Sequence, residues 1–261
     1  MHAHRRARAP GQHFLRSRRL SAELVEQAGV GSTDLVFEIG AGAGRLTEAL
    51  AHSGAHVLAV EFDPDLAQGL RRRFAKQSRV RILEADALEV RFPSRAFRAF
   101  GNIPFSISTA ILRRLLDDAE GAMERADLVV QFELARKRTA PWPSTLLSLS
   151  WAPWWTFSLA RRLPRAAFDP PPSVDAAFLS IRRREPPLLD AAERPRYQRA
   201  LRMAFTRSST PVRRSLALPP LVWKRLARDR GVALDAGPRD LDAFDWRAVY
   251  ALMAPIPREP Q

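Results

Sequence analysis

The sequence contains no cysteine and only five histidines. The absence of cysteine excludes disulfide bonds, a thiolate nucleophile and any zinc or iron–sulfur site built on thiolates. The histidines do not form the His-x-Glu-x-x-His pattern that binds catalytic zinc on a helix. We therefore expect no metal centre.

A membrane-spanning segment is also missing from the pattern. The uncharged stretch 139–160 contains Pro141, Pro143, Pro153 and seven serine or threonine residues, which makes it a poor spanning helix. We expect its four tryptophans to lie buried between a sheet and its helices. The basic start of the chain is not followed by the apolar segment of a secretory signal. These features predict that the protein does not contact a membrane and that it is located in the cytoplasm.

Acidic residues are few compared with basic ones. The chain of 261 residues carries 42 Lys and Arg against 28 Asp and Glu, a formal net charge of +14. The excess is +4 over residues 1–31, +1 over 32–160 and +9 over 161–261. Such a charge attracts polyanions, so nucleic acid is the expected partner. A solvated, arginine-rich surface is the alternative explanation of the charge alone.

Apolar segments typical of buried strands alternate with segments of helical periodicity, which is the pattern of a doubly wound, mainly parallel sheet. The last two strands follow a proline-rich loop and could pair antiparallel at the sheet's edge. We expect strands at 35–39, 56–61, 80–84, 96–101, 127–132, 154–160 and 174–182. We expect helices at 18–30, 45–53, 64–74 and 106–116, with Asp63 as the N-cap before Pro64.

Beyond residue 185 only helical periodicity remains, interrupted by prolines at 211, 219, 220 and 238. This change predicts a small, basic, all-helical C-terminal domain. The expected organisation is a basic N-terminal arm (1–16), an α/β catalytic domain (17–185) and a helical RNA-binding domain (186–261).

A glycine cluster follows the first expected strand and opens a helix, in the segment Glu38-Ile39-Gly40-Ala41-Gly42-Ala43-Gly44. In sheets of this class nucleotides bind beyond the carboxyl ends of the strands, where glycine lets the backbone approach the ligand. The dinucleotide fingerprint would place its third glycine at position 45, which is Arg45. The spacing fits S-adenosylmethionine better, because this cofactor has no pyrophosphate. A nicotinamide-dependent oxidoreductase is therefore a distant alternative.

Two further acids end the next two strands. Glu61 stands twenty-one residues beyond Gly40, where a carboxylate accepts the hydroxyls of a ribose. Asp86 ends the third strand and can accept a hydrogen bond from the amine of an adenine. The glycine segment, Glu61 and Asp86 follow three successive strands. This arrangement favours a site for a nucleoside-containing cofactor over unrelated surface residues.

The fourth strand ends in Asn102-Ile103-Pro104-Phe105, a pattern typical of methyltransferases that modify an amine on a planar ring. The lone pair of such an amine is delocalised into the ring, which makes the nitrogen a poor nucleophile. Hydrogen-bond acceptors aimed at its two protons favour a tetrahedral nitrogen, and the Asn102 side chain and Ile103 carbonyl can provide them. Pro104 fixes the turn, and Phe105 offers a stacking face for a base turned out of its helix.

Together these segments resemble the ribosomal RNA adenine N6-dimethyltransferase family, and more narrowly its Erm branch, over residues 11 to about 252. Further segments carry the resemblance: Gly11-Gln12-His13-Phe14-Leu15, Phe168-Asp169-Pro170-Pro171-Pro172-Ser173-Val174-Asp175 and Ala204-Phe205-Thr206-Arg207. The resemblance implies a class I S-adenosylmethionine-dependent fold and methylation of an adenine in 23S rRNA. Such methylation confers resistance to macrolide, lincosamide and streptogramin B antibiotics.

The resemblance also implies roles for individual residues. Asn102, Ile103, Pro104 and Phe105 would form the catalytic motif around the target amine, and Phe168 would enclose the target base. Phe62 is expected in the core or as a wall beside the cofactor. The cofactor would contact Gln12, His13, Leu15, Gly40, Gly42, Glu61, Asp86, Ala87 and Asn102. Arginines that would contact RNA phosphates are Arg8, Arg161, Arg162, Arg165, Arg207, Arg213 and Arg214.

The chain departs from the family pattern at two positions, since His13 replaces an asparagine and Phe105 replaces a common tyrosine. The housekeeping branch of the family, which dimethylates 16S rRNA, usually has leucine where this chain has Ile103. We expect the Erm branch, with 23S rRNA as precursor or unassembled large-subunit RNA as the partner, and a monomeric enzyme. The alternatives are the 16S enzyme and a non-catalytic nucleic-acid-binding relative.

Overall fold

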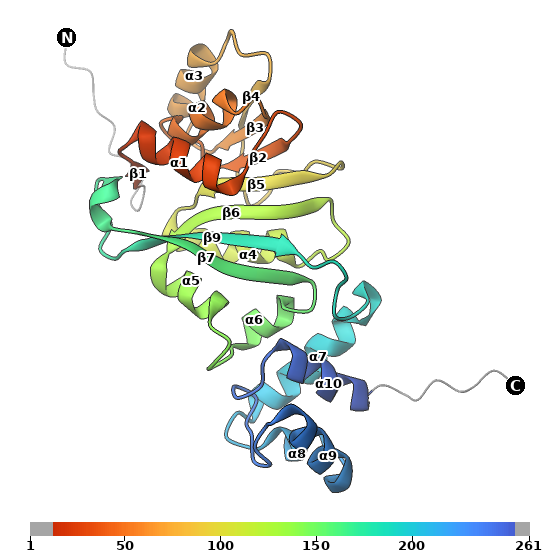
Figure 1. Cartoon of the computed structure of the whole chain (residues 1–261). Coiled ribbons are helices and arrows are strands. Elements are labelled where there is room, and N and C mark those ends of the chain that lie inside the picture. Colours follow the sequence, from red (N-terminus) through yellow and green to blue (C-terminus); the bar gives the residue numbers. More distant parts are fainter. Residues whose placement is uncertain (1–12, 254–261) are drawn as a thin grey trace, which may run out of the picture. The chain divides into compact units, whose positions relative to one another are not determined.

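The computed structural model describes residues 13–253, which form two compact units (Figure 1). The sheet unit contains the residues up to Ala135 together with Phe157–Arg182. The helical unit contains Arg136–Thr156 together with the residues from Arg183 onward. The sequence placed a single boundary after residue 185, whereas the structure groups 136–156 with the C-terminal helices.

Seven strands form one sheet in the order β4-β3-β2-β5-β6-β9-β7. Strands β2 to β6 run parallel to one another, and β9 runs antiparallel to β6. This confirms the predicted α/β class, and β7 lies beside β9 at the edge. The strands are β2 (Leu35–Ile39), β3 (His56–Glu61), β4 (Val80–Glu84), β5 (Phe97–Asn102), β6 (Met123–Gln131), β7 (Trp155–Leu163) and β9 (Ala176–Arg183).

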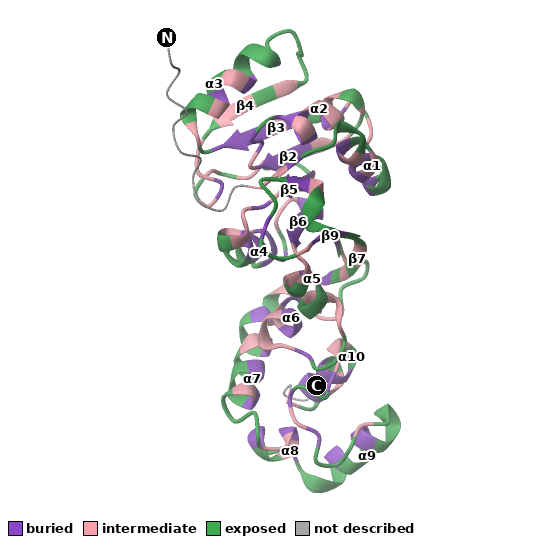
Figure 2. Ribbon diagram, turned by 90° about the vertical axis from the view of Figure 1, so that its left-hand side faces the viewer, coloured by how far each residue is buried: buried purple, intermediate pink, exposed green. Residues whose placement is uncertain are grey.

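The strand order changes direction at β2. From β2 the chain adds β3 and β4 on one side, then returns to place β5 and β6 on the other. The carboxyl ends of β2 and β5 therefore flank a topological switch point, which is where open α/β sheets bind their ligands. The strands are apolar here because both faces of the sheet are covered, and Figure 2 shows β2 and β3 as largely buried.

The helices of the sheet unit begin and end close to their predicted limits. They are α1 (Arg18–Ala28), α2 (Arg45–His52), α3 (Pro64–Arg73) and α4 (Ser108–Leu116), the last preceded by a 3-10 turn, η1 (Phe105–Ile107). Asp63 caps α3 by accepting the backbone N–H groups of Asp65 and Leu66, as predicted. Helices α1 and α4 lie on opposite sides of the strands (Figure 2).

A pair of two-residue strands, which the sequence did not indicate, joins the start of the described chain to the loop before β9. Strand β1 (Phe14–Leu15) pairs antiparallel with β8 (Phe168–Asp169). The backbone N–H of Arg16 adds a hydrogen bond of 2.8 Å to the Ala167 carbonyl. The N-terminal segment is thereby fixed against the sheet unit.

The helical unit packs its helices around buried aromatic side chains, including Tyr197, Trp223 and Trp246. Helix α5 (Phe132–Thr139) leads from the sheet unit into it. The other helices are α6 (Leu146–Trp151), α7 (Arg194–Thr206), α8 (Val212–Ser215), α9 (Pro220–Arg230) and α10 (Ala243–Met253), with a 3-10 turn, η3 (Ala191–Glu193). The helical breaks near the prolines agree with the sequence. Within residues 13–253 no helix has the length and apolar character needed to cross a bilayer.

The expectation of four buried tryptophans in the uncharged stretch was wrong for one of them. Trp151, Trp154 and Trp155 are buried, but Trp142 is 55% exposed. Trp142 stands in the loop between α5 and α6, flanked by two prolines. A proline on each side removes backbone donors and prevents regular structure that would carry the indole inward.

Candidate active site

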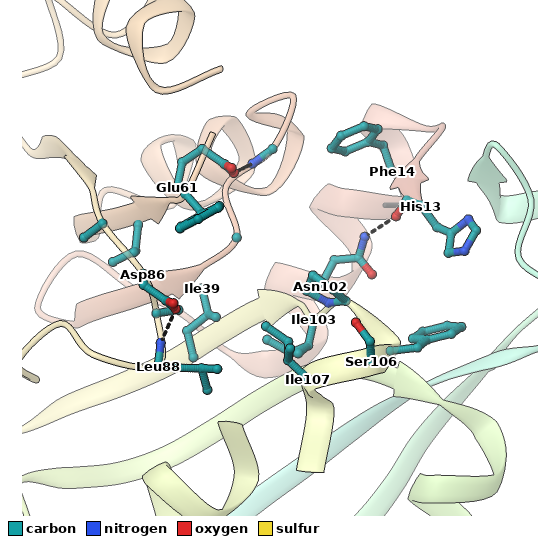
Figure 3. A pocket seen from close by; sticks show the side chains of 18 residues that line it. His13, Phe14, Ile39, Glu61, Asp86, Leu88, Asn102, Ile103, Ser106 and Ile107 are labelled. Atoms are coloured by element: carbon teal, nitrogen blue, oxygen red, sulfur yellow. Dashed lines mark hydrogen bonds between the residues drawn. The ribbon is translucent and has the colours of Figure 1, made fainter. Parts of the chain in front are cut away.

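A cavity of about 340 Å³ lies at the carboxyl ends of β2, β3, β4 and β5 in the sheet unit (Figure 3). Ligand pockets in proteins typically begin at about this size. The cavity brings together the catalytic motif 102–105. It also brings together six of the predicted cofactor residues besides Asn102, namely His13, Gly40, Gly42, Glu61, Asp86 and Ala87.

The glycine loop after β2 turns sharply because its backbone adopts a left-handed conformation at Gly40, Gly42 and Gly44. The requirement is strictest at Gly42, where a Cβ atom would lie 2.5 Å from the Phe14 ring. The N–H groups of Gly40 and Ala41 both donate to the Val60 carbonyl, each at an N···O distance of 3.0 Å. The loop is therefore hydrogen-bonded to the end of β3 and packs against Phe14 of the N-terminal segment.

Glu61 holds this part of the site together. Its carboxylate is buried and accepts the Gly42 N–H at 2.7 Å and the Asp63 N–H at 2.9 Å. Each carboxylate oxygen has a second lone pair, so both can still accept hydroxyl groups from a ligand in the cavity. The position and chemistry fit the ribose role that the sequence predicted.

Asp86 lies one strand further on, in the turn after β4. Its Oδ1 accepts the Leu88 N–H at 2.7 Å. Arg114 of α4 donates to the Ala87 and Val90 carbonyls, and its guanidinium lies 4.4 Å from the centre of the Phe92 ring. Sequence analysis missed this arginine clamp, because Arg114 is twenty-eight residues from Asp86 and follows an ordinary helical pattern.

Asn102 has one defined orientation. Its Nδ2 donates to the backbone carbonyl of His13 at 2.6 Å (Figure 3). A carbonyl only accepts, so this contact identifies the amide nitrogen and leaves the side-chain Oδ1 as the acceptor for a ligand. In this orientation Oδ1 can accept a hydrogen bond from an amine, which is the role that the sequence analysis proposed for Asn102.

His13 connects three parts of the site. Its Nδ1 donates to the Pro170 carbonyl at 2.8 Å, its main-chain carbonyl accepts from Asn102, and its ring centre is 5.8 Å from that of Phe105. The Pro170 contact requires the proton on Nδ1. The imidazole thus fixes the N-terminal segment against the loop before β9.

Behind the glycine loop, the Glu38 carboxyl is fully buried. This burial is the main reason that the pKa of Glu38 is raised to about 7; hydrogen bonds with Thr47 oppose the rise, and the neighbouring Glu61 charge contributes to it. The sequence marked Glu38 as part of the glycine motif but did not predict a carboxyl that holds a proton near neutral pH. A raised pKa of this kind is expected for a carboxyl that is buried away from water, because burial disfavours its charged form.

Phe62 is not a core residue. Its side chain is 73% exposed and lines the cavity beside Glu61, so only the second of its two predicted placements, a wall beside a cofactor, is compatible with the structure. Ser106 and Ile107 also line the cavity. They were missed because they begin the helical segment after the motif and carry no distinctive chemistry.

One predicted contact needs correction. Phe168 is fully buried in the hydrophobic core and pairs with Leu15 across β8 and β1, so in this structure its ring is not placed to enclose a base. Leu15 is buried in the same core and lines a small second cavity with Gly40 and Asn102, and its contact with the cofactor stays a prediction. Gln12 and Arg8 lie outside the described residues.

The six described arginines of the predicted RNA surface fall into two groups. Those of the sheet unit already have partners: Arg161 pairs with Glu23 at 2.9 Å, Arg162 pairs with Asp175 at 2.7 Å, and the Arg165 Nε donates to the Pro172 carbonyl at 2.8 Å. Arg207, Arg213 and Arg214 belong to the helical unit, where Arg207 and Arg214 are exposed.

Comparisons with known proteins agree with this site. The sequence model of the family described as "Ribosomal RNA adenine dimethylase" matches residues 3–237. The chain belongs to this family. It is 36% identical to the mycinamicin-resistance protein MyrB of Micromonospora griseorubida over 96% of this chain and 80% of that protein.

Two further relatives place the chain within the family. The crystal structure of the 23S rRNA methyltransferase ErmE superposes with a TM-score of 0.83 at 30% identity, covering 92% of this chain and all of that one. A ribosomal RNA small subunit methyltransferase A of Synechococcus is 33% identical over 92% of this chain and 93% of its own length. The chain is an Erm-type rRNA adenine N6-methyltransferase with the class I fold.

The family uses S-adenosylmethionine, and the cavity suits that molecule. It combines buried and half-buried carboxylates at two adjacent strand ends with apolar walls from Ile39, Leu88 and Ile103. A nucleoside needs this pairing of hydroxyl acceptors and apolar ring contacts. Within residues 13–253 no group of three potential metal-binding side chains lies together.

Proposed function

We propose that this enzyme methylates N6 of one adenine in 23S rRNA and thereby confers resistance to macrolide, lincosamide and streptogramin B antibiotics. The observation that carries the proposal is the orientation of Asn102, whose free Oδ1 lines the cavity at the switch point of the sheet. The similarity to MyrB and to ErmE supports the antibiotic-related target.

In this proposal the cofactor's adenosyl part lies along the strand ends. Glu61 accepts the ribose hydroxyls, Asp86 accepts the adenine amine, and Phe62 and Ala87 bound the adenine ring. His13 and the backbone at Gly40 and Gly42 lie toward the methionine part. When bound, S-adenosylmethionine supplies a methyl group on a positively charged sulfur.

The chain's own residues prepare the target nitrogen. The Asn102 Oδ1 and the Ile103 carbonyl accept hydrogen bonds from its two N–H groups, which withdraws the lone pair from the ring and aims it along one direction. Phe105 provides the stacking face, and Pro104 fixes the turn that joins these groups. Alignment and exclusion of water, rather than a strong base, lower the barrier for such a displacement.

The cofactor assignment is tested with Glu61→Ala. Loss of the ribose acceptors should weaken S-adenosylmethionine binding by at least tenfold, about the effect of one charge-assisted hydrogen bond. Calorimetric titration measures it, with the exposed Glu120→Gln as the control. Unchanged affinity would remove Glu61 from the ribose.

The target is tested by primer extension on ribosomal RNA from cells that express the protein. A stop at one 23S adenine, together with increased macrolide resistance, is expected. Stops at adjacent 16S adenines would instead support the second candidate, the housekeeping dimethyltransferase, which the similarity to the Synechococcus enzyme favours.

The remaining assignments follow from the same proposal. The enzyme acts in the cytoplasm, as a monomer, on precursor or unassembled 23S RNA whose bases are still accessible. The helical unit binds RNA through Arg207, Arg213 and Arg214. A non-catalytic binding protein would not need the oriented Asn102 or the carboxylates around the cavity.

A further inference from the structure

Trp142 is the one exposed tryptophan of the chain. The other five are buried, whereas 55% of the Trp142 side chain is exposed in the loop between α5 and α6. This loop belongs to the helical unit and not to the unit that holds the cavity. Exposed indoles are uncommon because a tryptophan gains much from burial, so its position calls for a partner.

The backbone that carries Trp142 is held firmly. Two residues further on, the Ser144 N–H donates to the Arg239 carbonyl at 2.9 Å and the Ser144 hydroxyl to the Pro238 carbonyl at 3.2 Å. Pro141 and Pro143 restrict the backbone on both sides of the indole. A ring presented by a fixed loop loses little backbone entropy when it binds.

Two chain segments are hydrogen-bonded to each other here, the α5–α6 loop and the segment around Arg239. Each has a cationic residue in it or next to it. Lys137, near the end of α5, and Arg239 are exposed. Neither of them forms an ion pair with another residue of 13–253. The nearest acid along the second segment, Asp240, has its Oδ2 occupied by the Gly237 N–H at 2.8 Å. From Leu134 to Ala160 the chain holds three cations and no acid.

We propose that Trp142, Lys137 and Arg239 form a second RNA contact, in which the indole stacks on an unpaired base and the two cations bind the adjoining phosphates. The proposal rests on the proposed RNA-methylating function. Proteins hold single-stranded nucleotides with exposed aromatic rings and nearby cations. The absence of acids from 134–160 favours a polyanion over an apolar protein partner.

The test measures the affinity of the full-length protein for two labelled RNA hairpins of equal length, one with unpaired adenosines in its stem and one fully paired. Trp142→Ala should weaken binding of the first roughly tenfold, within the range for one stacked base. Binding of the paired hairpin should change less than twofold. Trp142→Phe should retain most of the affinity, because it keeps a stacking face.

The matched control is Leu221→Ala, which removes another exposed apolar side chain of the helical unit, 82% exposed on α9. It should leave both affinities unchanged. Lys137→Ala and Arg239→Ala should each reduce the slope of log K against log salt by about 0.7, the contribution of one phosphate of a single strand. Equal melting temperatures and cofactor affinities would show that the variants fold.

Fluorescence gives a second, independent measurement. RNA with unpaired bases should quench part of the wild-type tryptophan emission, and the quenching should disappear in Trp142→Phe. The proposal is overturned if Trp142→Ala leaves affinity for the unpaired hairpin unchanged or weakens both hairpins equally. A change of oligomeric state instead of RNA affinity would assign the indole to a protein contact. Methylation of 23S rRNA by the wild type tests the proposed function separately.

Discussion

At the residue scale, the site depends on a few polar atoms whose partners are main-chain groups. Glu61 is held by the backbone N–H groups of Gly42 and Asp63, and Asn102 by the His13 carbonyl. Backbone partners keep such side chains in place while the cavity is empty. Single substitutions at these two positions should therefore affect function much more than folding.

Asn102→Ala should reduce methyl transfer by roughly a hundredfold or more, because the target amine loses its positioned acceptor. Affinity for S-adenosylmethionine should stay within a few-fold. Asn102→Asp should also fail, since a carboxylate oxygen would face the His13 carbonyl. Single-turnover assays measure the transfer, and Gln77→Ala, an exposed position outside the cavity lining, is the control. Normal turnover of Asn102→Ala would contradict the assigned role.

Glu38 makes folding depend on pH. Its pKa rises from 4.5 to about 7 on folding, so the unfolded chain ionises first as pH rises. The folded state then loses stability between pH 4.5 and 7, by about 3 kcal/mol. Glu38→Gln should remove this loss, so that the free energy of unfolding of the variant increases relative to that of the wild type as pH rises. Urea unfolding at pH 4.5 and 8 measures it. A difference that is constant with pH would contradict the buried carboxyl.

At the element scale, the strand ends were readable from the sequence but the contacts across elements were not. The apolar runs at 35–39, 56–61 and 80–84 coincide with β2, β3 and β4. Parallel strands that are largely buried, such as β2 and β3, leave a strong signal, whereas β4 is a partly exposed edge strand. Strands β1 and β8 have only two residues each, too short for any periodicity. Their pairing also explains why Phe168 became a core residue.

The loop after β4 provides the test at this scale. Removal of the Arg114 guanidinium should free the Ala87 and Val90 carbonyls and loosen the turn that carries Asp86. Arg114→Ala should therefore weaken S-adenosylmethionine binding roughly tenfold, while Arg114→Lys should recover part of it. The neighbouring exposed Arg113→Ala is the control. Equal affinities for both alanine variants would contradict the clamp.

For the whole molecule, the chain's division into units was only partly predictable. Proline positions indicated the helical C-terminal region, but residues 136–156 join it through α6, which packs beside α7. A periodicity argument follows the chain in order and does not detect a segment that leaves one unit and returns to it. Truncation after residue 185 would leave the buried side chains of α6 without their cover.

Substitution is therefore the better test of RNA binding by the helical unit. Changing Arg207, Arg213 and Arg214 together to alanine should weaken binding of a 23S rRNA transcript. It should also lower the slope of log K against log salt by about 2, if each arginine neutralises one phosphate. The triple change Arg225, Arg228 and Arg247 to alanine matches the loss of charge. Equal effects of both triple variants would indicate a general charge effect instead of a defined surface.

The hydrogen bond from Asn102 to the main chain at position 13 affects how the enzyme tolerates change. Every amino acid offers the same peptide oxygen, so a histidine can occupy the place of an asparagine at little cost to the orientation of the Asn102 amide. Shortening the chain past this position would remove the oxygen altogether. Proteolysis beyond this position should then reduce methyl transfer while the sheet stays folded.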